Sequence, residues 1–477
     1  MVKHRVILIC AAGALTTACA VGPNYKRPTV AATDSFKELD GWKPSEPADV
    51  LSRGPWWQIF HDEVLNQLES QIDISNENVK AAAAAVEQAQ ALVQQAQAGF
   101  WPILSLSADR EKQRIGPLHP AFTNTVAGSA SWNIDIWGQI RRTVEGDKAS
   151  WQSKEAALEA ARLSAQATLA IDYFQLRAQD QLQVLFDDIV EAEQQSLKIT
   201  QSRYSTGVAA RSDVITAQTQ LLSSQAQQAN NAVQRGVLEH ALAVLVGQQP
   251  ALFSVKATAM RSDVPTVPAG VPSALLERRP DVAEAERSVA AANAQIGVAI
   301  SAWFPTVQLT GSASYTAPGL AGLFSLPNQV WSVGPQLAAT LFDGGLRKAQ
   351  VRSARAAYEA SVDSYRETVL GGFQQVEDQL VTLRVLENVQ VIQDQAVVAA
   401  KEAERLTLEQ YKSGTVNYIN VITQQATRLN AEVTALNVLL SRLTASVTLI
   451  EALGGGWTAE QLNEPPRAPS RKGEPRP

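Results

Sequence analysis

Four short segments of the chain alternate apolar and polar residues, which is the pattern of a β-strand with one apolar and one polar face. In residues 126–136 the even positions are apolar or small and the odd positions are mostly polar. The alternation recurs over residues 306–315 and 331–341, and more weakly over residues 103–109. About ten residues with two such faces suit a transmembrane strand. A half-buried sheet on a helical domain is the alternative.

A sheet of four strands cannot close into a barrel by itself. An open edge in lipid would leave N–H and C=O groups unpaired, at several kcal/mol for each group. Identical chains would therefore have to pool their strands. Two chains would give a narrow barrel filled by its own side chains, whereas three would give twelve strands and a lumen wide enough for water and solute. The strand pattern thus favours a homotrimer.

Two long segments, residues 146–204 and 346–411, are rich in strong helix formers and contain no proline. At about 1.5 Å per residue, each would form a helix of roughly 90–100 Å. Each ends at a Tyr-x-x-Gly turn, where Gly207 or Gly414 suits the left-handed conformation of a helix C-cap. Returning helices are predicted over residues 212–246 and 419–453. We predict two long helical hairpins, although a soluble coiled coil shares this signal.

The landmarks of the first half recur in the second half about two hundred residues later. Phe100-Trp101-Pro102 matches Trp303-Phe304-Pro305, and Tyr204-Ser205-Thr206-Gly207 matches Tyr411-Lys412-Ser413-Gly414. Residues 121–249 and 336–464 both lack proline. The shared order indicates a tandem duplication. The predicted organisation is a signal peptide at 1–18, a lipid-anchored extended segment at 19–61, a first repeat at 62–260, a second repeat at 261–456 and a disordered tail at 457–477.

The first residues resemble a bacterial lipoprotein signal. Lys3 and Arg5 precede an apolar run over residues 6–15, which is too short to span a bilayer, and small residues then lead to Cys19. The resemblance implies removal of residues 1–18 and a covalent lipid on Cys19. Because Ala20 rather than Asp follows, it also implies sorting to the outer membrane. Thr16 stands where such signals usually carry Leu, and an ordinary secretory signal is the alternative.

Composition and charge exclude several other classes of protein. The 477 residues carry 41 basic and 47 acidic side chains, a formal charge of −6 that leaves no general basic surface for nucleic acid. Two cysteines and four histidines are too few for a disulfide framework or a metal-rich protein. The triplet Gly454-Gly455-Gly456 lacks the Lys and Ser/Thr of a phosphate loop. We predict no catalytic residues, no metal, no cofactor besides the covalent lipid, and no nucleic-acid partner.

Several specific motifs occur together in the chain, namely the sequence from Cys19 to Pro28, Trp56-Trp57, Arg279-Pro280-Asp281, Phe342-Asp343-Gly344-Gly345 and the two Tyr-x-x-Gly turns. In combination they resemble the outer-membrane efflux factors, in particular their NodT-like lipoprotein branch. The resemblance covers nearly the whole mature chain and implies a mixed α and β membrane protein. In it, a trimeric twelve-stranded outer-membrane barrel continues into a twelve-helix periplasmic barrel. The implied partners are a periplasmic membrane-fusion adaptor and an inner-membrane pump, usually of the resistance-nodulation-division type.

The resemblance also implies roles for the two helical turns. Gly207 and Gly414, with Thr206 and Ser413 beside them, would receive the hairpin tips of the adaptor, because a glycine lets another backbone approach closely. Plain helix capping is the alternative and is compatible with docking.

A periplasmic gate is implied close to these turns. Tyr411 and Asp213 would hydrogen-bond between helices and keep the aperture shut. Asn420 stands where the second half would match Asp213, which predicts a looser gate than in relatives. Asp213 could instead N-cap the returning helix.

Aromatic residues at the ends of the predicted strands suit an interfacial girdle. Trp101, Trp137, Trp303 and Phe342 lie where a barrel strand would meet the membrane–water boundary. Ordinary core aromatics are the alternative.

The predicted function is an outer-membrane channel that conducts drugs and toxic compounds from the pump and adaptor to the exterior. One alternative is an exit duct for type I protein secretion, against which the lipidated start argues. The other is an envelope-bridging lipoprotein scaffold without a pore, against which the two-faced strands argue.

Overall fold

The computed structural model describes residues 20–30, 36–39, 55–114, 119–267 and 278–457. The predicted signal peptide, Cys19 and the tail beyond residue 457 lie outside the described residues. Trp457 itself is buried and donates its backbone N–H to the Gly454 carbonyl at 3.0 Å, so the ordered chain includes the first residue of the predicted tail. Short 3-10 helices cover Lys37–Leu39, Trp56–Phe60, Pro250–Leu252 and Leu326–Asn328.

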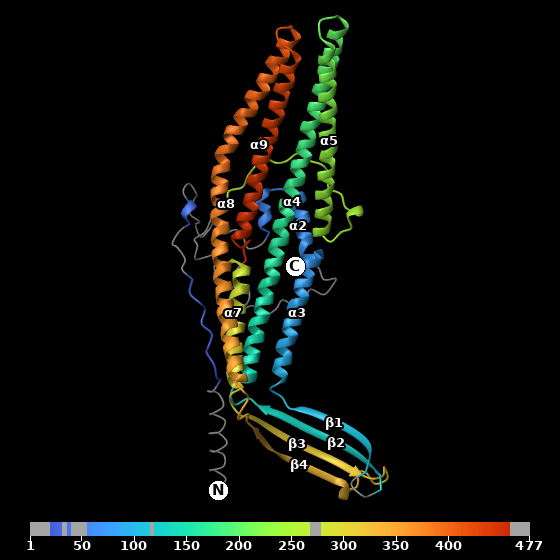
Figure 1. Ribbon diagram of the computed structural model, residues 1–477, viewed down its shortest axis with the longest axis vertical. Helices are drawn as coiled ribbons and strands as arrows, with labels where there is room; N and C mark the ends of the chain where they lie inside the picture. Colours follow the sequence, from blue (N-terminus) through green and yellow to red (C-terminus); the bar gives the residue numbers. More distant parts are fainter. Residues whose placement is uncertain (1–19, 31–35, 40–54, 115–118, 268–277, 458–477) are drawn as a thin grey trace. The chain divides into compact units, whose positions relative to one another are not determined.

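Helices α4 (Gln139–Ser205) and α5 (Arg211–Leu245) form one hairpin, and α8 (Leu346–Lys412) and α9 (Tyr418–Ala452) form the other (Figure 1). Both hairpins are confirmed. Helix α4 begins before the predicted residue 146, because the Asp135 carboxylate accepts the backbone N–H groups of Ile140 and Arg141, each at 3.0 Å. This carboxylate satisfies donors that a helix start leaves unpaired. The shorter helices are α2 (Glu63–Ser75), α3 (Glu77–Ala98) and α7 (Pro280–Ser301).

Four strands, β1 (Ile103–Gln113), β2 (Ala121–Ile134), β3 (Thr306–Ala317) and β4 (Gln329–Ala338), form one antiparallel sheet in the order β1-β2-β3-β4. All four predicted strands are confirmed, with β1, β2 and β3 longer than predicted and β4 starting and ending earlier. The central pair, β2 and β3, joins the two halves of the sequence. Strands β1 and β4 form the two edges, so each has one side without a partner strand among the described residues.

The chain divides into two compact units that do not coincide with the sequence repeats. The first unit contains the sheet and comprises the described residues within Met1–Val30, Ala84–Glu155 and Ala283–Thr368. The second comprises the described residues within Ala31–Ala83, Ala156–Val282 and Val369–Pro477. Each unit therefore combines segments from both repeats. The main apolar core lies in the second unit and includes Trp56, Leu65, Ile72, Leu169, Leu380, Leu443 and Leu449.

Helix α9 is the one described helix that is long and apolar enough to cross a membrane, by length and composition. Of its most apolar window, 44% is buried inside the protein. Leu443, Val447 and Ile450 of this helix belong to the core of the second unit. The apolar character of α9 is therefore explained by burial against neighbouring helices.

Candidate functional site

The strand register sorts the sheet into two chemically distinct faces. Residues directly opposite each other in an antiparallel pair point to the same side. A row runs from Leu104 through Ala130 and Gly311 to Val333. The apolar face defined by this row and its neighbours contains Leu104, Leu106, Ala108, Val126, Gly128, Ala130, Trp132, Ile134, Val307, Leu309, Gly311, Ala313, Tyr315, Trp331, Val333, Pro335 and Leu337.

Much of this apolar face is uncovered within the chain. Leu104, Leu106, Trp331 and Val333 are between 68% and 80% exposed. An apolar surface that extends over a whole sheet without cover requires a partner or a lipid environment. The alternation and the strand lengths match those of an outer-membrane barrel wall.

The opposite face of the sheet is polar. Hydroxyl groups pair across the strands, with Ser312 Oγ 2.9 Å from Ser332 Oγ and Thr125 Oγ1 3.4 Å from Thr316 Oγ1. Such a face suits the water-filled side of a barrel wall. Its polar members are Ser105, Ser107, Asp109, Glu111, Thr123, Thr125, Ser129, Ser131, Asn133, Gln308, Thr310, Ser312, Ser314, Thr316, Ser332 and Gln336.

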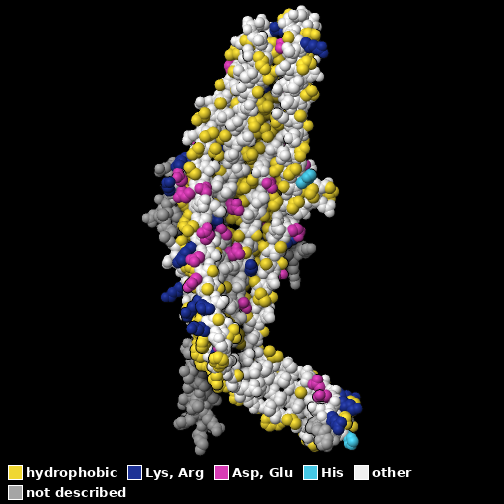
Figure 2. Space-filling view, viewed as in Figure 1, with side chains coloured by type: hydrophobic (Ala, Val, Ile, Leu, Met, Phe, Trp, Pro, Cys, Tyr) yellow, Lys and Arg dark blue, Asp and Glu magenta, His cyan; other side chains and the backbone are white. Residues whose placement is uncertain are grey.

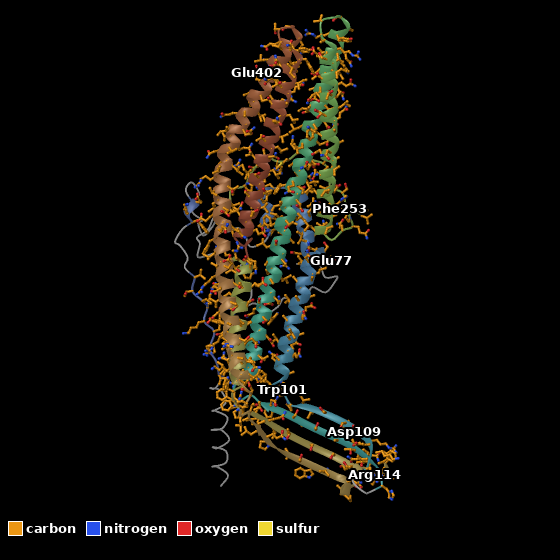
Figure 3. The ribbon with its side chains drawn as sticks, in the orientation of Figure 1. Glu77, Trp101, Asp109, Arg114, Phe253 and Glu402 are labelled. Atoms are coloured by element: carbon orange, nitrogen blue, oxygen red, sulfur yellow. The ribbon has the colours of Figure 1, made fainter. Side chains whose placement is uncertain are left out.

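The predicted aromatic girdle lies in the first unit, where the strands meet the helices (Figure 3 labels Trp101). Trp101, Trp303 and Phe342 are 74%, 50% and 89% exposed, so their rings are available to a membrane interface. Trp137 differs, because its indole N–H donates to the Pro305 carbonyl at 2.7 Å and its ring stacks on Phe304 with 4.6 Å between centroids. Trp137 thus connects the two halves of the chain where the strands meet the helices.

The residues that follow Cys19 are held against the first unit. The Val21 backbone N–H donates to the Trp137 carbonyl at 3.1 Å, and Arg142 donates to the Val21 carbonyl at 3.1 Å and to Asn24 Oδ1 at 2.9 Å. A Cβ atom added to Gly138 would lie 2.8 Å from the Ala20 Cα. The first described residue after Cys19 therefore lies beside the girdle residue Trp137.

The two hairpin turns have the predicted backbone geometry. Gly207 and Gly414 adopt φ angles of 79° and 82°, which L-residues rarely take. A Cβ atom on Gly207 would meet no atom within 4 Å, so the backbone angle rather than crowding requires glycine there. Thr206 Oγ1 donates to the Arg203 carbonyl at 3.0 Å, and Ser413 Oγ donates to the Gln410 carbonyl at 2.9 Å. Both turns thus cap their own helices and leave their outer surface open.

Tyr411 is held by helix α4 of its own chain. Its side chain is 3% exposed, and its hydroxyl lies 3.1 Å from Thr200 Oγ1. The Arg203 guanidinium lies 4.6 Å from the Tyr411 ring centroid and donates to the Tyr411 carbonyl. These contacts join the first hairpin to the second.

Asp213 is not brought to Tyr411 within one chain. Over the described residues, no hydrogen bond joins the two side chains. Asp213 lies half-exposed in the first turn of α5, whose N-cap is Ala210, so the alternative that Asp213 N-caps this helix is wrong. Asn420 is exposed in the first turn of α9. A Tyr411–Asp213 latch stays a prediction for contacts between chains.

Two buried groups are functional candidates that the sequence pattern did not identify, namely Tyr418 beside Tyr411 and Glu193, which interacts electrostatically with Tyr418. The Tyr418 ring lies 5.3 Å from that of Tyr411, and burial raises the pKa of Tyr418 to about 12. The Glu193 carboxylate accepts from Gln220 Nε2 at 3.0 Å, and burial raises the pKa of Glu193 above its ordinary value. The spacing of Tyr418 and Val421 on one helical face is a signal that could have identified Tyr418.

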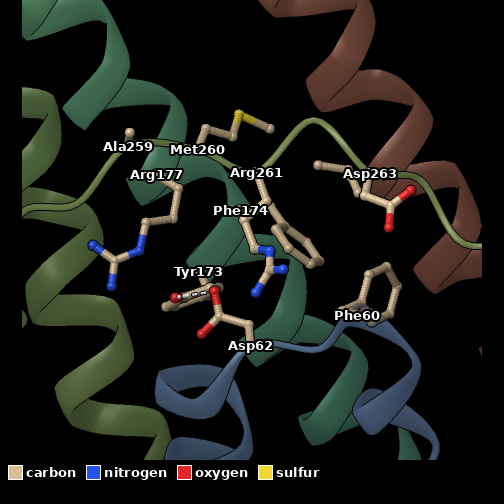
Figure 4. Close-up of a pocket in the computed structure, with 10 residues that line it drawn as sticks. Phe60, Asp62, Tyr173, Phe174, Arg177, Ala259, Met260, Arg261 and Asp263 are labelled. Atoms are coloured by element: carbon tan, nitrogen blue, oxygen red, sulfur yellow. Dashed lines mark hydrogen bonds between the residues drawn. The ribbon is translucent and has the colours of Figure 1, made fainter.

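A small cavity in the second unit lies beside Tyr173 and Asp62 (Figure 4). Three of its polar lining residues, Asp62, Tyr173 and Arg177, have internal partners. Asp62 caps helix α2 through the Val64 N–H at 2.9 Å and accepts the Tyr173 hydroxyl at 2.7 Å. Arg177 donates to Asp180 Oδ2 and to the Lys256 carbonyl, each at 2.8 Å. These contacts indicate a structural cavity rather than a ligand site.

Comparisons with known proteins agree with this geometry. The family model described as "Outer membrane efflux protein" matches residues 68–248 and 271–455. The probable efflux pump outer membrane protein TtgC of Pseudomonas putida (strain KT2440) is 28% identical over 470 residues, covering 95% of this chain and 96% of that protein. The cation efflux system protein CusC of Escherichia coli O6:H1 is 28% identical over 471 residues, covering 95% and 99%. The solved outer-membrane channel OprN is 28% identical, with a TM-score of 0.84 and coverage of 92% and 100%.

Proposed function

The chain belongs to the outer membrane efflux protein family and is an outer-membrane efflux channel, and we propose that three copies of it form the exit duct of a tripartite pump. The observation that carries the trimer is the sheet, which has one apolar face, one polar face and two edges that lack a partner strand. Pairing β1 of one chain with β4 of the next satisfies both edges. Three chains then close a twelve-stranded barrel.

The wall of such a barrel conducts passively. Hydroxyl and amide side chains on the polar face replace part of the hydration of a passing solute, and the apolar face contacts lipid. The inner-membrane pump supplies the energy, so the duct requires no catalytic group. We accordingly assign this chain no reaction, no metal and no cofactor beyond a covalent lipid.

We propose that Cys19 carries that lipid. The placement of Ala20 and Val21 beside Gly138 and Trp137 supports this assignment, because it would put an acyl chain next to Trp137, a residue of the predicted aromatic girdle. An acyl chain and an aromatic belt both partition to the membrane boundary. Lipid anchor and barrel would then insert at the same depth.

We propose that the adaptor docks on the two turns at Gly207 and Gly414, beside Thr206 and Ser413. Support comes from the Gly207 backbone, where a Cβ atom would meet no other atom within 4 Å, and from the apolar side chains around both turns. Val208 and Ile419 are 65% and 56% exposed. An apolar rim around a glycine turn is a surface into which the tip of a helical hairpin can pack.

We propose that the gate lies directly above these turns, at Tyr411. Its hydroxyl bond to Thr200 and its stacking with Arg203 hold α8 against α4 within one chain. Asp213 and Asn420, on the returning helices, are free to face a neighbouring chain. Because Asn420 is neutral, the second contact lacks a charge-assisted hydrogen bond, and the gate is looser than a symmetric pair of acids would make it.

The proposed cargo is small molecules, namely drugs and toxic compounds. The names of TtgC and CusC refer to an efflux pump and to cation efflux, and neither name refers to protein export. These names and the predicted lipid anchor favour small-molecule efflux over type I protein secretion.

A photo-crosslinker at Ser413 in cells tests the assignment, with captured proteins identified by mass spectrometry and the purified protein examined for trimers and conductance. Capture of a pump adaptor supports the duct, and an adaptor of a one-step protein exporter would support type I secretion instead. A conducting trimer that captures no adaptor during active export overturns the docking site alone. A chain that forms neither trimer nor pore overturns the channel and supports the scaffold.

A further inference from the structure

At the C-terminal end of strand β1, acidic and basic side chains point to opposite faces of the sheet. The sequence there is Asp109-Arg110-Glu111-Lys112. Strand alternation places Arg110 and Lys112 on the apolar face, in line with Leu104 and Leu106, and places both acids on the polar face. Figure 2 shows basic and acidic side chains gathered at this end of the sheet, and Figure 3 labels Asp109 there. Charge is therefore sorted by sign between the two faces.

One aromatic ring holds both cations. The Arg110 guanidinium carbon lies 4.6 Å, and Lys112 Nζ 5.3 Å, from the centroid of the Phe122 ring. Lys112 lies directly opposite Phe122 in the strand register, so the arrangement follows from the pairing of β1 with β2. Contact with the face of a ring orders a cation without neutralising it.

Within the described ranges of the chain, neither Arg110 nor Lys112 forms an ion pair with a carboxylate. Residues 317–338, which would lie nearest in a neighbouring chain paired through β4, contain no Asp or Glu. A ligand for this pair must therefore bring its own negative charge.

The position of the pair along the strand matches the outer boundary of a membrane. From Leu104 to Lys112 the strand advances about 26 Å at about 3.3 Å per residue. At a strand tilt of about 40° this is about 20 Å along the barrel axis, close to the apolar band of about 25 Å in outer-membrane barrels. Charged side chains on the lipid side are tolerated near that boundary and costly at the bilayer centre.

We propose that Arg110 and Lys112, ordered by Phe122, bind the phosphate groups of anionic lipid headgroups in the outer leaflet. The inference rests on the proposed outer-membrane barrel, because only that placement brings the apolar face of β1 to lipid. A guanidinium offers a two-pronged donor to phosphate, and an ammonium adds a point charge beside it. Three copies of the pair would encircle the barrel at its exit.

The test measures binding of lipopolysaccharide, as a phosphate-bearing glycolipid, to the purified full-length trimer by native mass spectrometry. Arg110→Gln together with Lys112→Gln is expected to weaken binding by about 25-fold, since each cation near an anionic membrane surface contributes about 5-fold. The matched control is Asp109→Asn with Glu111→Gln, on the opposite face of the same strand, which should not weaken binding. Arg110→Lys preserves the charge and should retain most of the binding.

Three outcomes would overturn the proposal. They are equal binding by the double glutamine variant, equal binding of enzymatically dephosphorylated lipopolysaccharide by the wild type, and binding of inorganic phosphate alone as tight as that of lipopolysaccharide, which would assign the site to free phosphate. Trimer assembly on a gel shows that each variant is folded. Conductance of the wild type in a plain phospholipid bilayer separately tests the channel, so a conducting trimer that ignores lipid phosphates contradicts this inference alone.

Discussion

The two repeats end their returning helices with the same backbone geometry and different side chains. Gly247 and Gly454 follow α5 and α9 with φ angles of 66° and 89°. A Cβ atom would lie 2.3 Å from the Ser75 carbonyl oxygen at Gly247, and 2.0 Å from the Arg278 carbonyl oxygen at Gly454. The close approach of two backbones is thus common to both halves of the duplicated chain.

The side chains that cap these helices have diverged. In the first repeat, Asn76 Nδ2 donates to the Leu245 carbonyl at 2.8 Å. In the second, the Arg279 guanidinium donates to the Ala452 carbonyl at 3.0 Å, to Gln375 Oε1 at 2.9 Å and to Asp281 Oδ2 at 2.6 Å. A neutral amide caps one helix, whereas a buried cation joins α9, α8 and the start of α7. The Arg-Pro-Asp motif therefore has a structural role, because its arginine joins these three helices.

The hairpin tips diverge further. Tyr204 of the first repeat is 47% exposed, whereas Tyr411, its sequence counterpart, is 3% exposed beneath Arg203. Where a repeat packs against its own elements, the two halves keep the same close backbone approach, although the side chains that cap the helices differ. Where one repeat packs against the other, as at Tyr411, a single copy can be buried and the halves become unequal.

The largest expected effect concerns the close backbone approach that the two repeats share at Gly247 and Gly454. Gly454→Ala and Gly247→Ala should each lower the free energy of unfolding by about 2–5 kcal/mol, because the new Cβ meets a carbonyl oxygen and the φ angle is unfavourable for an L-residue. Gly236→Ala is the matched control, since a Cβ atom at that position would meet no other atom within 4 Å. It should stabilise the α5 helix by about 0.5–1 kcal/mol. Denaturant unfolding in detergent measures all three, and a tolerated Gly247→Ala would show that only one repeat depends on this approach.

The next prediction tests the difference between the caps. Arg279→Ala should cost about 2–4 kcal/mol, because it leaves the Ala452 carbonyl and Gln375 without their donor in a buried site. Asn76→Ala should cost about 1–2 kcal/mol, the usual loss of an N-cap, since Asn76 Oδ1 also accepts the Asn78 and Val79 N–H groups at 3.0 and 3.1 Å. The same unfolding assay decides the order. A larger loss of stability for Asn76→Ala would contradict the interpretation that Arg279 stabilises the protein more than Asn76 does.

A smaller effect is expected at the tips. Tyr411→Phe removes the hydroxyl bond to Thr200 and should weaken the closed tip by about 0.5–1.5 kcal/mol. Combined with Asp213→Ala, it should raise single-channel conductance in planar bilayers. Tyr204→Phe is the matched control on the exposed counterpart and should leave conductance unchanged. Unchanged conductance in the Tyr411 and Asp213 double variant would remove both residues from the gate.

The smallest expected effect concerns the pH dependence of stability at Glu193, a position where the two repeats differ by a carboxylate. Burial raises the pKa of Glu193 above the ordinary value of about 4.3. Between that value and the raised pKa, the folded state binds more protons than the unfolded state, so stability falls as pH rises through this window and is constant above it. Glu193→Gln should remove this part of the pH dependence in thermal unfolding. Glu191→Gln, at an exposed neighbour, should keep it.

Most of the secondary structure was predictable from local pattern. Period-two alternation identified the strands, and the absence of breakers identified the long helices. The pattern predicts the start of helix α4 at a later residue than the structure shows. The reason is that the cap comes from Asp135, a residue that the pattern assigns to a strand. Gly207 and Gly414 were predictable as turn residues because a C-cap glycine has a local conformational cause.

The sequence by itself determined the alternation of the strands, the two hairpins and the glycine turns, because each depends on residues close together in the chain. Tertiary structure alone decided that Arg203 covers Tyr411, that Arg279 joins three helices and that Arg110 and Lys112 share the ring of Phe122. These contacts depend on which helices pack together and on strand register. Periodicity specifies the face of an element but not the element that it meets.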